Sequence, residues 1–201
     1  MLDLDDLDLV KEELFNFVWN FKHGDNIIYN FEILQSLYTA KENDPNPKLL
    51  NKPITVTIVS IIEAILIDFL ARIDQAKGHL PAGIAEQTLN EIKIEIAKKK
   101  KPVKIEDDIL GEMIYMKRKM YHYNEIVELF KKHEIFGEKG DPIYNQLKHF
   151  GDMRNRVHIE NYHQNLEGHE AQVFSANRLE ALEETLRSLW VKMANDYKRP
   201  W

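Results

Sequence analysis

The stretch "ITVTIVSIIEAILIDFL", Ile54 to Leu70, is the most apolar part of the chain and decides its fold. Apolar residues occupy nearly every side of a helix drawn through it, which is typical of a helix buried in a core. The run contains Glu63 and Asp68 and is shorter than the ~20 apolar residues that cross a bilayer. We therefore expect a central core helix and no membrane contact, although the β-branched residues at its start would also suit a strand.

Two amphipathic helices are predicted before this run, because apolar residues recur there three and four positions apart. These residues are Leu7, Val10, Leu14, Phe17 and Val18 in the first helix, and Ile27, Ile28, Phe31, Leu34, Leu37 and Tyr38 in the second. The break between them is expected near "KHGDN", Lys22 to Asn26, so that residues 1–40 would form an antiparallel helical hairpin. The next stretch, Lys41 to Pro53, holds three prolines and predicts a connecting loop.

Helices are also predicted for most of the chain after the central run. They cover about Ile84 to Lys98, one or two segments between Glu106 and Gly137, Pro142 to about Val157, and the segment after Ser175, which suits an N-cap. No repeat and no strand pair with a two-residue turn is evident, and Val173 and Phe174 are the only marginally extended stretch. The expected fold is an all-α helical bundle, with residues 1–201 as one domain and the core bundle at 53–201.

The composition of the chain indicates an ordinary globular protein. Of its 201 residues, 44% are hydrophobic and 30% are charged, which argues against disorder. The absence of cysteine excludes disulfides and thiolate metal sites, and the N-terminus lacks the pattern of a signal peptide, so we expect a cytoplasmic protein. The net charge of -6 means that any nucleic acid must be bound through a local basic patch.

Most cofactor and metal chemistries lack their sequence motifs here. His149, His158, His163 and His169 cluster in the last third of the chain, but their spacings match no standard zinc pattern. The glycine patterns of nucleotide-binding loops and the motifs of serine nucleophiles are also missing. We therefore expect no metal ion and no cofactor.

The stretch "FGDMRNRVHIEN", Phe150 to Asn161, concentrates polar and cationic residues at the end of an otherwise ordinary helix. On a helix, Arg154 and His158 are separated by ~400° of rotation and ~6 Å of rise, so they lie on one face and could address one phosphate. Arg156 points ~200° away from Arg154 and would face solvent or a partner. The alternative is a purely structural helix end, where cations favour the carbonyl dipole.

This arrangement resembles the HEPN superfamily, whose all-helical domains occur in many prokaryotic toxin and phage-defence proteins and in some eukaryotic RNases. Its signature is an arginine, a polar residue, and a histidine after four to six intervening residues, near the end of a late helix. Arg154, Asn155 and His158 match in type and order, with three residues between the arginine and the histidine. "SIIEAILIDFL", Ser60 to Leu70, also looks like the glutamate-bearing central helix of several members, so the resemblance covers loosely Ile27 to Tyr197.

The resemblance implies a metal-independent endoribonuclease of a toxin or phage-defence system. His158 would act as general base or acid, Arg154 would neutralise the phosphate, and Asn155 would orient the histidine or bind the phosphate. A homodimer is implied, because two such motifs normally share one cleft, and an antitoxin or another protein partner could restrain the enzyme. Arg156 with His163 is a second-ranked pair. Since many members only bind or scaffold, a non-catalytic module that binds a protein or nucleic acid remains the alternative.

Three further features have both a functional and a structural interpretation. The run Lys98, Lys99, Lys100 and Lys101 could contact RNA phosphates, but such runs are more often solvated helix ends. "YMKRKMYHY", Tyr115 to Tyr123, could stack on bases, but its apolar members fit the packing stripe of a helix. Glu63, surrounded by apolar residues, is predicted either to pair with Arg154 or Arg156, or to lie on a narrow exposed stripe.

Overall fold

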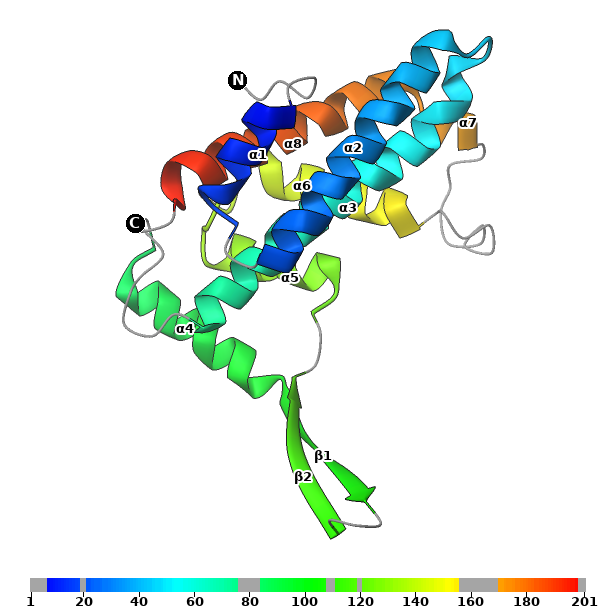
Figure 1. Cartoon of the computed structure of the whole chain (residues 1–201). Coiled ribbons are helices and arrows are strands. Elements are labelled where there is room, and N and C mark those ends of the chain that lie inside the picture. Colours follow the sequence, from blue (N-terminus) through cyan, green and yellow to red (C-terminus); the bar gives the residue numbers. More distant parts are fainter. Residues whose placement is uncertain are drawn as a thin grey trace.

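The computed structural model describes residues 7–18, 21–75, 84–107, 111–118, 121–155 and 170–198. The fold is all-α in class, as predicted, with one β-hairpin that extends away from the helices (Figure 1). Its strands are β1 (Lys100–Asp107) and β2 (Gly111–Arg118). The helices are α1 (Leu7–Phe15), α2 (Phe21–Asn43), α3 (Asn51–Gln75), α4 (Glu86–Lys98), α5 (Tyr123–Lys132), α6 (Pro142–Asn155), α7 (Glu170–Val173) and α8 (Ala176–Asp196), with a 3-10 turn, η1 (Pro47–Leu50), before α3.

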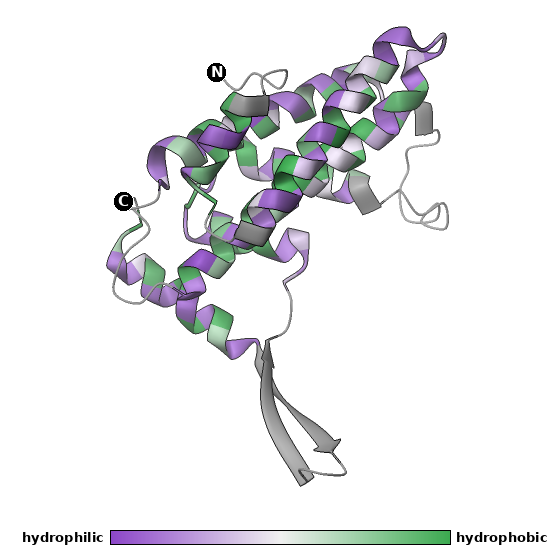
Figure 2. Cartoon of the chain, in the orientation of Figure 1, coloured by the Kyte–Doolittle hydropathy of each residue, from purple (hydrophilic) through white to green (hydrophobic). Residues whose placement is uncertain are grey.

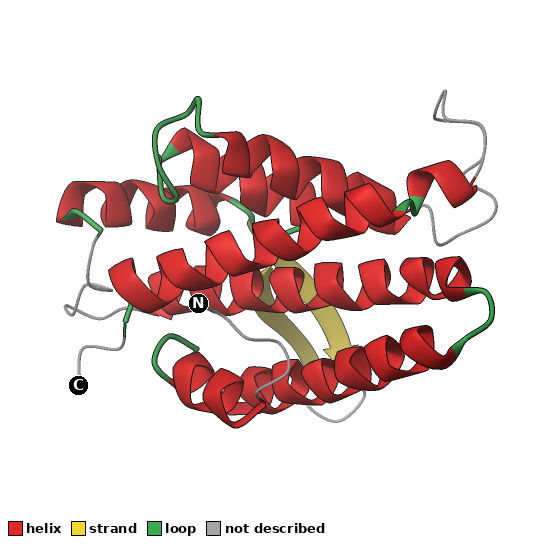
Figure 3. Ribbon diagram, turned by 90° about the horizontal axis from the view of Figure 1, so that it is seen from above, coloured by secondary structure: helices red, strands yellow, loops and turns green. Residues whose placement is uncertain are grey.

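Helix α3 is the central helix that the apolar run predicts. Helices α2 and α8 pack along it, α4, α5 and α6 contact it as well, and Figure 3 shows the long helices lying roughly parallel to one another. Its side chains at Ile58, Ile62 and Ile65 are completely buried. The span from Pro47 to Gln75 is long and apolar enough to cross a bilayer, but 61% of its most apolar window is buried inside the protein. It is therefore a core helix.

The outer helices are amphipathic. In Figure 2 hydrophobic and hydrophilic residues alternate along them, which is the pattern expected of helices with one buried side. Trp190 of α8 is almost fully buried, and its ring meets those of Phe17 and Phe31 edge-on at centroid distances of 4.9 and 5.5 Å. Its Nε1 donates a hydrogen bond of 2.7 Å to Glu13 Oε2, so this residue ties α8 to α1.

The break between the first two helices lies earlier than the sequence predicts. Residues Lys22 to Asn26 belong to α2, and α1 ends at Phe15. The reason is the buried Arg72 of α3, whose Nη1 donates a hydrogen bond of 2.6 Å to the carbonyl oxygen of Phe17. A carbonyl held in this way stabilises the turn after α1. The predicted loop from Lys41 to Pro53 is also shorter, because α2 continues to Asn43 and α3 begins at Asn51.

The hairpin contradicts the helix that the sequence predicts from Glu106 onward. Strands β1 and β2 are antiparallel, and their register pairs Val103 with Tyr115 and Ile105 with Met113. Apolar residues at every second position suit a strand. Helix prediction is correct only from Tyr123, where α5 begins. The prediction of a marginally extended stretch at Val173 and Phe174 is also wrong, because Val173 ends α7 and Phe174 lies in a turn.

Two buried tyrosines hold the turn between α5 and α6. The hydroxyl of Tyr144 accepts a hydrogen bond of 2.8 Å from the N–H of Phe136 and donates one of 2.9 Å to the carbonyl of Gly137. The hydroxyl of Tyr197 donates to the carbonyl of Ile135. Gly137 has φ of 135°, which a residue with a β-carbon rarely adopts. Burial raises the pKa of Tyr144 to about 12 and also raises the pKa of Tyr197.

Tyr144→Phe is expected to lower the free energy of unfolding at neutral pH by about 1–3 kcal/mol, because it leaves the buried N–H of Phe136 and the partly buried carbonyl of Gly137 without this partner. The pKa of Tyr144 is higher in the folded protein than the value of about 10 in the unfolded chain. Its contribution is therefore complete below pH ~10 and is lost as the pH rises toward ~12. Urea unfolding from neutral to alkaline pH should show a smaller alkaline loss in the variant. Tyr29→Phe, on a side chain 62% exposed, is the control and should match the parent protein; an identical alkaline loss in Tyr144→Phe would contradict the prediction.

Candidate functional site

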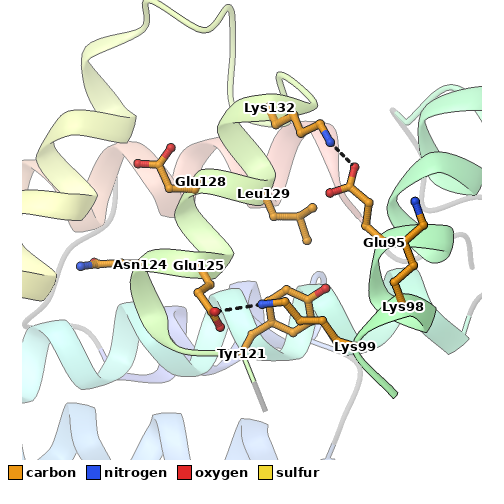
Figure 4. Close-up of a pocket in the computed structure, with 9 residues that line it drawn as sticks. All are labelled: Glu95, Lys98, Lys99, Tyr121, Asn124, Glu125, Glu128, Leu129 and Lys132. Atoms are coloured by element: carbon orange, nitrogen blue, oxygen red, sulfur yellow. Dashed lines mark hydrogen bonds and ion pairs between the residues drawn. The ribbon is translucent and has the colours of Figure 1, made fainter. Parts of the chain in front are cut away.

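A groove of about 610 Å³ lies between α4 and α5 at the base of the hairpin (Figure 4). It brings together the first two lysines of the predicted basic run, Lys98 and Lys99, and the residues that follow β2. Its lining is mixed in charge and includes one aromatic ring. The lining residues are Glu95, Lys98, Lys99, Tyr121, Asn124, Glu125, Glu128, Leu129 and Lys132.

Lys99 fixes the junction between α4, the hairpin and α5. Its Nζ lies 2.9 Å from Glu125 Oε1 and 4.0 Å from the centroid of the Tyr121 ring. The other oxygen of Glu125 accepts a hydrogen bond of 3.0 Å from the backbone N–H of His122, at the start of α5. An acidic residue in this first turn also favours the helix dipole. The base of the hairpin is therefore anchored to the first turn of α5.

The acidic residues of the groove are paired with cations. Glu95 Oε1 lies 2.6 Å from Lys132 Nζ and 2.9 Å from His133 Nε2. Burial opposes ionisation of Glu95, but the hydrogen bonds and charges of Lys132 and His133 outweigh it and lower the pKa of that carboxyl. Glu128 pairs with Lys148 at 2.8 Å, and this hydrogen bond lowers the pKa of Glu128. Lys98 is exposed, and the described contacts give it no ion pair.

The predicted basic run is divided by the change from helix to strand. Lys98 is the last residue of α4, whereas Lys100 and Lys101 begin β1. Because neighbouring residues of a strand belong to opposite faces, these two lysines do not share a face. The register places Lys100 opposite Arg118 and Lys101 opposite Lys117. The predicted run is therefore split between the end of a helix and the start of a strand.

Helix α6 is held close to the start of α5. Asn124 Nδ2 donates a hydrogen bond of 2.8 Å to Asp152 Oδ1. Gly151 permits this approach, since a β-carbon there would lie 2.4 Å from the ring of Tyr123. Arg154 and Asn155, the last residues of α6, follow Asp152 after one intervening residue, Met153. The backbone that begins the Arg-Asn-x-x-His motif thus lies on the element joined to the groove wall.

The structure describes only some of the other predicted site residues. Arg156, His158 and His163 lie outside the described residues, as do the side chains of Arg154 and Asn155. Glu63 is half-buried, and its pairing with Arg154 or Arg156 stays a prediction. The buried carboxylate of α3 is Asp68, which is 2% exposed and lies 3.4 Å from Nδ1 of His23. The sequence shows Asp68 within the apolar run, but it does not show that His23 of α2 lies beside it.

Sequence reasoning missed the part of the groove that comes from the segment after β2. Tyr121, Asn124 and Glu125 stand next to Lys99 only because the hairpin returns the chain to its starting point. The signal was present in "YMKRKMYHY", whose basic and aromatic residues favoured a nucleic-acid contact as one of two interpretations. The predicted packing stripe of a helix is wrong for Tyr115 to Arg118, which belong to β2.

No family model matches the chain, and no significantly similar curated protein or solved structure was found. Among the residues that the structure describes, no group of three or more His, Asp or Glu side chains is arranged to hold a metal ion. The groove combines three lysines with three glutamates and one aromatic ring, and Lys98, the lysine without a described ion pair, adjoins the lysines that begin β1. Such a set suits an anionic chain with stacking bases.

Proposed function

We propose that this protein is a HEPN-like RNA-binding protein of the cytoplasm that cleaves RNA without a metal ion, in a toxin or phage-defence system. One observation carries the proposal: the cations at the base of the hairpin and the motif-bearing helix α6 are both attached to the start of α5. Lys99 makes the first attachment through Glu125, and Asp152 makes the second through Asn124. An RNA backbone held at the first would pass near the second.

Phosphates are bound in this proposal by Lys98, Lys100 and Arg118, and not by Lys99. Lys99 already pairs with Glu125 at 2.9 Å, so RNA would have to displace that carboxylate. Lys98 is exposed, and Lys100 pairs in register with Arg118 on one face of the hairpin. Like charges placed directly opposite destabilise a sheet. A phosphate chain bound along this face would relieve that repulsion.

In this proposal, the Arg-Asn-x-x-His motif carries out the cleavage of RNA. His158 takes the proton of a ribose 2′-hydroxyl, and the oxygen attacks the adjacent phosphorus while the bond to the 5′-oxygen breaks. Arg154 neutralises the charge that builds on the phosphate, and Asn155 orients the imidazole. The leaving 5′-oxygen needs a proton from a second acid, for which the His158 of a second copy is proposed. The products are a 2′,3′-cyclic phosphate and a 5′-hydroxyl end.

A non-catalytic binding module is the second candidate. The ion pairs of Glu95 with Lys132 and of Glu128 with Lys148 favour this candidate. Catalysis needs charge directed at the reacting atom, whereas a groove whose charges are already paired can still bind a partner. The two candidates differ in one observable result. The module binds RNA or a protein and leaves a labelled RNA intact in EDTA, whereas the enzyme cleaves it.

Binding of a labelled single-stranded RNA in EDTA tests the proposed contacts. The double variant Lys100→Gln/Arg118→Gln is expected to reduce the slope of log affinity against log salt by about 1.4, since each phosphate contact to a single strand contributes ~0.7. Fluorescence anisotropy across a salt series measures the slope. The control is Lys48→Gln/Lys139→Gln, which removes two exposed cations outside the groove and should leave the slope unchanged. Equal slopes for the two double variants, or no binding by the parent protein at low salt, would contradict the proposal.

A further inference from the structure

A second pocket, of about 530 Å³, lies where the start of α3 meets the start of α8. In Figure 1 the turn that joins α2 to α3, where η1 lies, is at the end of the helical body away from the hairpin. The pocket shares no described lining residue with the groove at the hairpin base. Its described lining contains two lysines and no acidic residue. It is made by Lys48, Leu49, Asn51 and Lys52 on one side and by residues 174–176 on the other.

The start of α8 presents backbone donors to this pocket. The first N–H groups of an α-helix have no partner within the helix, and together with the helix dipole they favour an anion. Ser175 is the N-cap residue of α8, which is 21 residues long, but its side chain makes no capping hydrogen bond. The first turn of α8 also contains no acidic residue. The helix itself therefore supplies no negative charge at this end.

The side chain of Asn51 indicates independently that a ligand belongs here. Asn51 lines the pocket although it is only 2% exposed. Its Nδ2 donates a hydrogen bond of 2.9 Å to the carbonyl of Phe174, which ties α3 to the residue before the N-cap of α8. Its Oδ1 is buried and has no hydrogen-bond partner among the residues that the structure describes. A buried acceptor without a partner is costly, so a bound molecule that donates to this oxygen is favoured.

The remaining side chains of the pocket are cationic or apolar. Lys52 Nζ lies 5.6 Å from the centroid of the Phe174 ring, and Lys48 is exposed. Leu49 is 68% exposed, so a ligand that covers it would remove apolar surface from water. The pocket therefore suits one molecule that combines a negative charge, an N–H donor close to that charge, and an apolar group.

We propose that this pocket binds the C-terminal end of a peptide or protein whose last residue is apolar. The free carboxylate lies at the start of α8, where the backbone N–H groups and the lysines meet it. The N–H of the last peptide bond donates to Asn51 Oδ1, and the last side chain lies against Leu49 and Phe174. An RNA phosphate matches the charge but carries no aliphatic group beside it. The site is separate from the groove, so the proposal does not depend on the nuclease function.

Fluorescence anisotropy of a labelled peptide tests the ligand chemistry with the full-length chain. The probe is fluorescein-labelled Gly-Ser-Gly-Ser-Leu with a free C-terminal carboxylate, which the parent protein should bind. The same peptide amidated at its C-terminus loses the charge, and the same peptide N-methylated at its last peptide bond loses the donor. Each should bind about tenfold more weakly or worse. These comparisons leave the protein unchanged, so the folding of a variant does not enter into them.

Ser175→Asp tests the position of the carboxylate on the protein. Aspartate is also a favoured N-cap residue, so α8 should stay folded. Its carboxylate would occupy the N–H groups of the first turn and repel that of the peptide, so the affinity should fall by about tenfold or more. Ser175→Ala, which adds no charge, should bind the peptide like the parent. Lys139→Glu, which adds negative charge outside the pocket, should do the same. Circular dichroism checks that each variant is folded.

Four results would overturn the proposal. The parent fails to bind the free peptide, the amidated or N-methylated peptide binds as strongly, or folded Ser175→Asp keeps the affinity of the parent. The fourth is displacement of the peptide by a short single-stranded RNA or by acetate at the same concentration, which would assign the pocket to phosphates or to any small anion. RNA cleavage plays no part in these readouts, so the nuclease proposal and this one fail separately.

Discussion

Replacing His158 with alanine is expected to lower the rate of metal-free RNA cleavage by about 100- to 10,000-fold, the usual contribution of a positioned acid or base. The imidazole is the group of the Arg-Asn-x-x-His motif that can both take and return a proton near neutral pH. Its loss should affect the chemical step and leave RNA affinity nearly unchanged, because phosphate binding is assigned to cations elsewhere. The measurement is single-turnover cleavage of a labelled RNA in EDTA, with anisotropy as the separate measure of affinity.

Two histidine variants serve as controls for this result. His149→Ala removes an exposed histidine of α6 and should leave the rate unchanged. His163→Ala tests the second-ranked pairing with Arg156. A large loss with His163→Ala and none with His158→Ala would transfer the chemistry to that pair. If the parent protein, His158→Ala and His163→Ala all cleave RNA equally, the nuclease proposal fails and the binding module remains.

Phe69→Ala is expected to destabilise the fold by about 4 kcal/mol, the usual cost of emptying an aromatic site in a core. Phe69 is fully buried on α3, and its ring lies 5.6 Å from that of Phe130 and 4.6 Å from that of Tyr197, measured between centroids. The guanidinium of Arg72 lies 4.6 Å from its centre, so a cation–π contact is lost as well. Urea unfolding measures the change, and the melting temperature should fall by about 10 °C.

The matched control for this variant is another truncation of an apolar residue. Ile94 of α4 is 56% exposed, and Ile94→Ala should change the free energy of unfolding by less than about 0.5 kcal/mol. A small effect of Phe69→Ala with an unchanged denaturant slope would mean that α3 is not the centre of the core. A large effect of Ile94→Ala would mean that its exposed side is covered by a partner.

The helices could be predicted from the sequence where the helical spacing of apolar residues was the only periodic pattern present. The bounds of α3, α4, α6 and α8 fall close to the predicted segments, because each has apolar residues three and four apart and a breaker at one end. Ser175 is the N-cap residue of α8 as predicted, although its side chain makes no capping hydrogen bond. These are local properties, and a sequence carries them directly.

The hairpin and the site could not be predicted in the same way. Lysine, glutamate and methionine favour helices, so the segment from Lys100 to Arg118 carried a helical preference that competed with its alternating Val103, Ile105, Met113 and Tyr115. The break after α1 depends on Arg72, which is distant in sequence from Phe17. The groove likewise needs Lys99 beside Tyr121, a contact that exists only once β1 and β2 have paired. Tertiary contacts decide all three.

The closing register pair of the hairpin has a consequence for how this protein can change. Because Lys100 and Arg118 face each other directly, the chain leaves α4 and returns toward α5 at points about 5 Å apart. Because its two ends lie next to each other, the hairpin can change in length and sequence while the path of the surrounding helices stays the same. Recognition surfaces on the hairpin are therefore free to diverge at little thermodynamic risk to the core around α3.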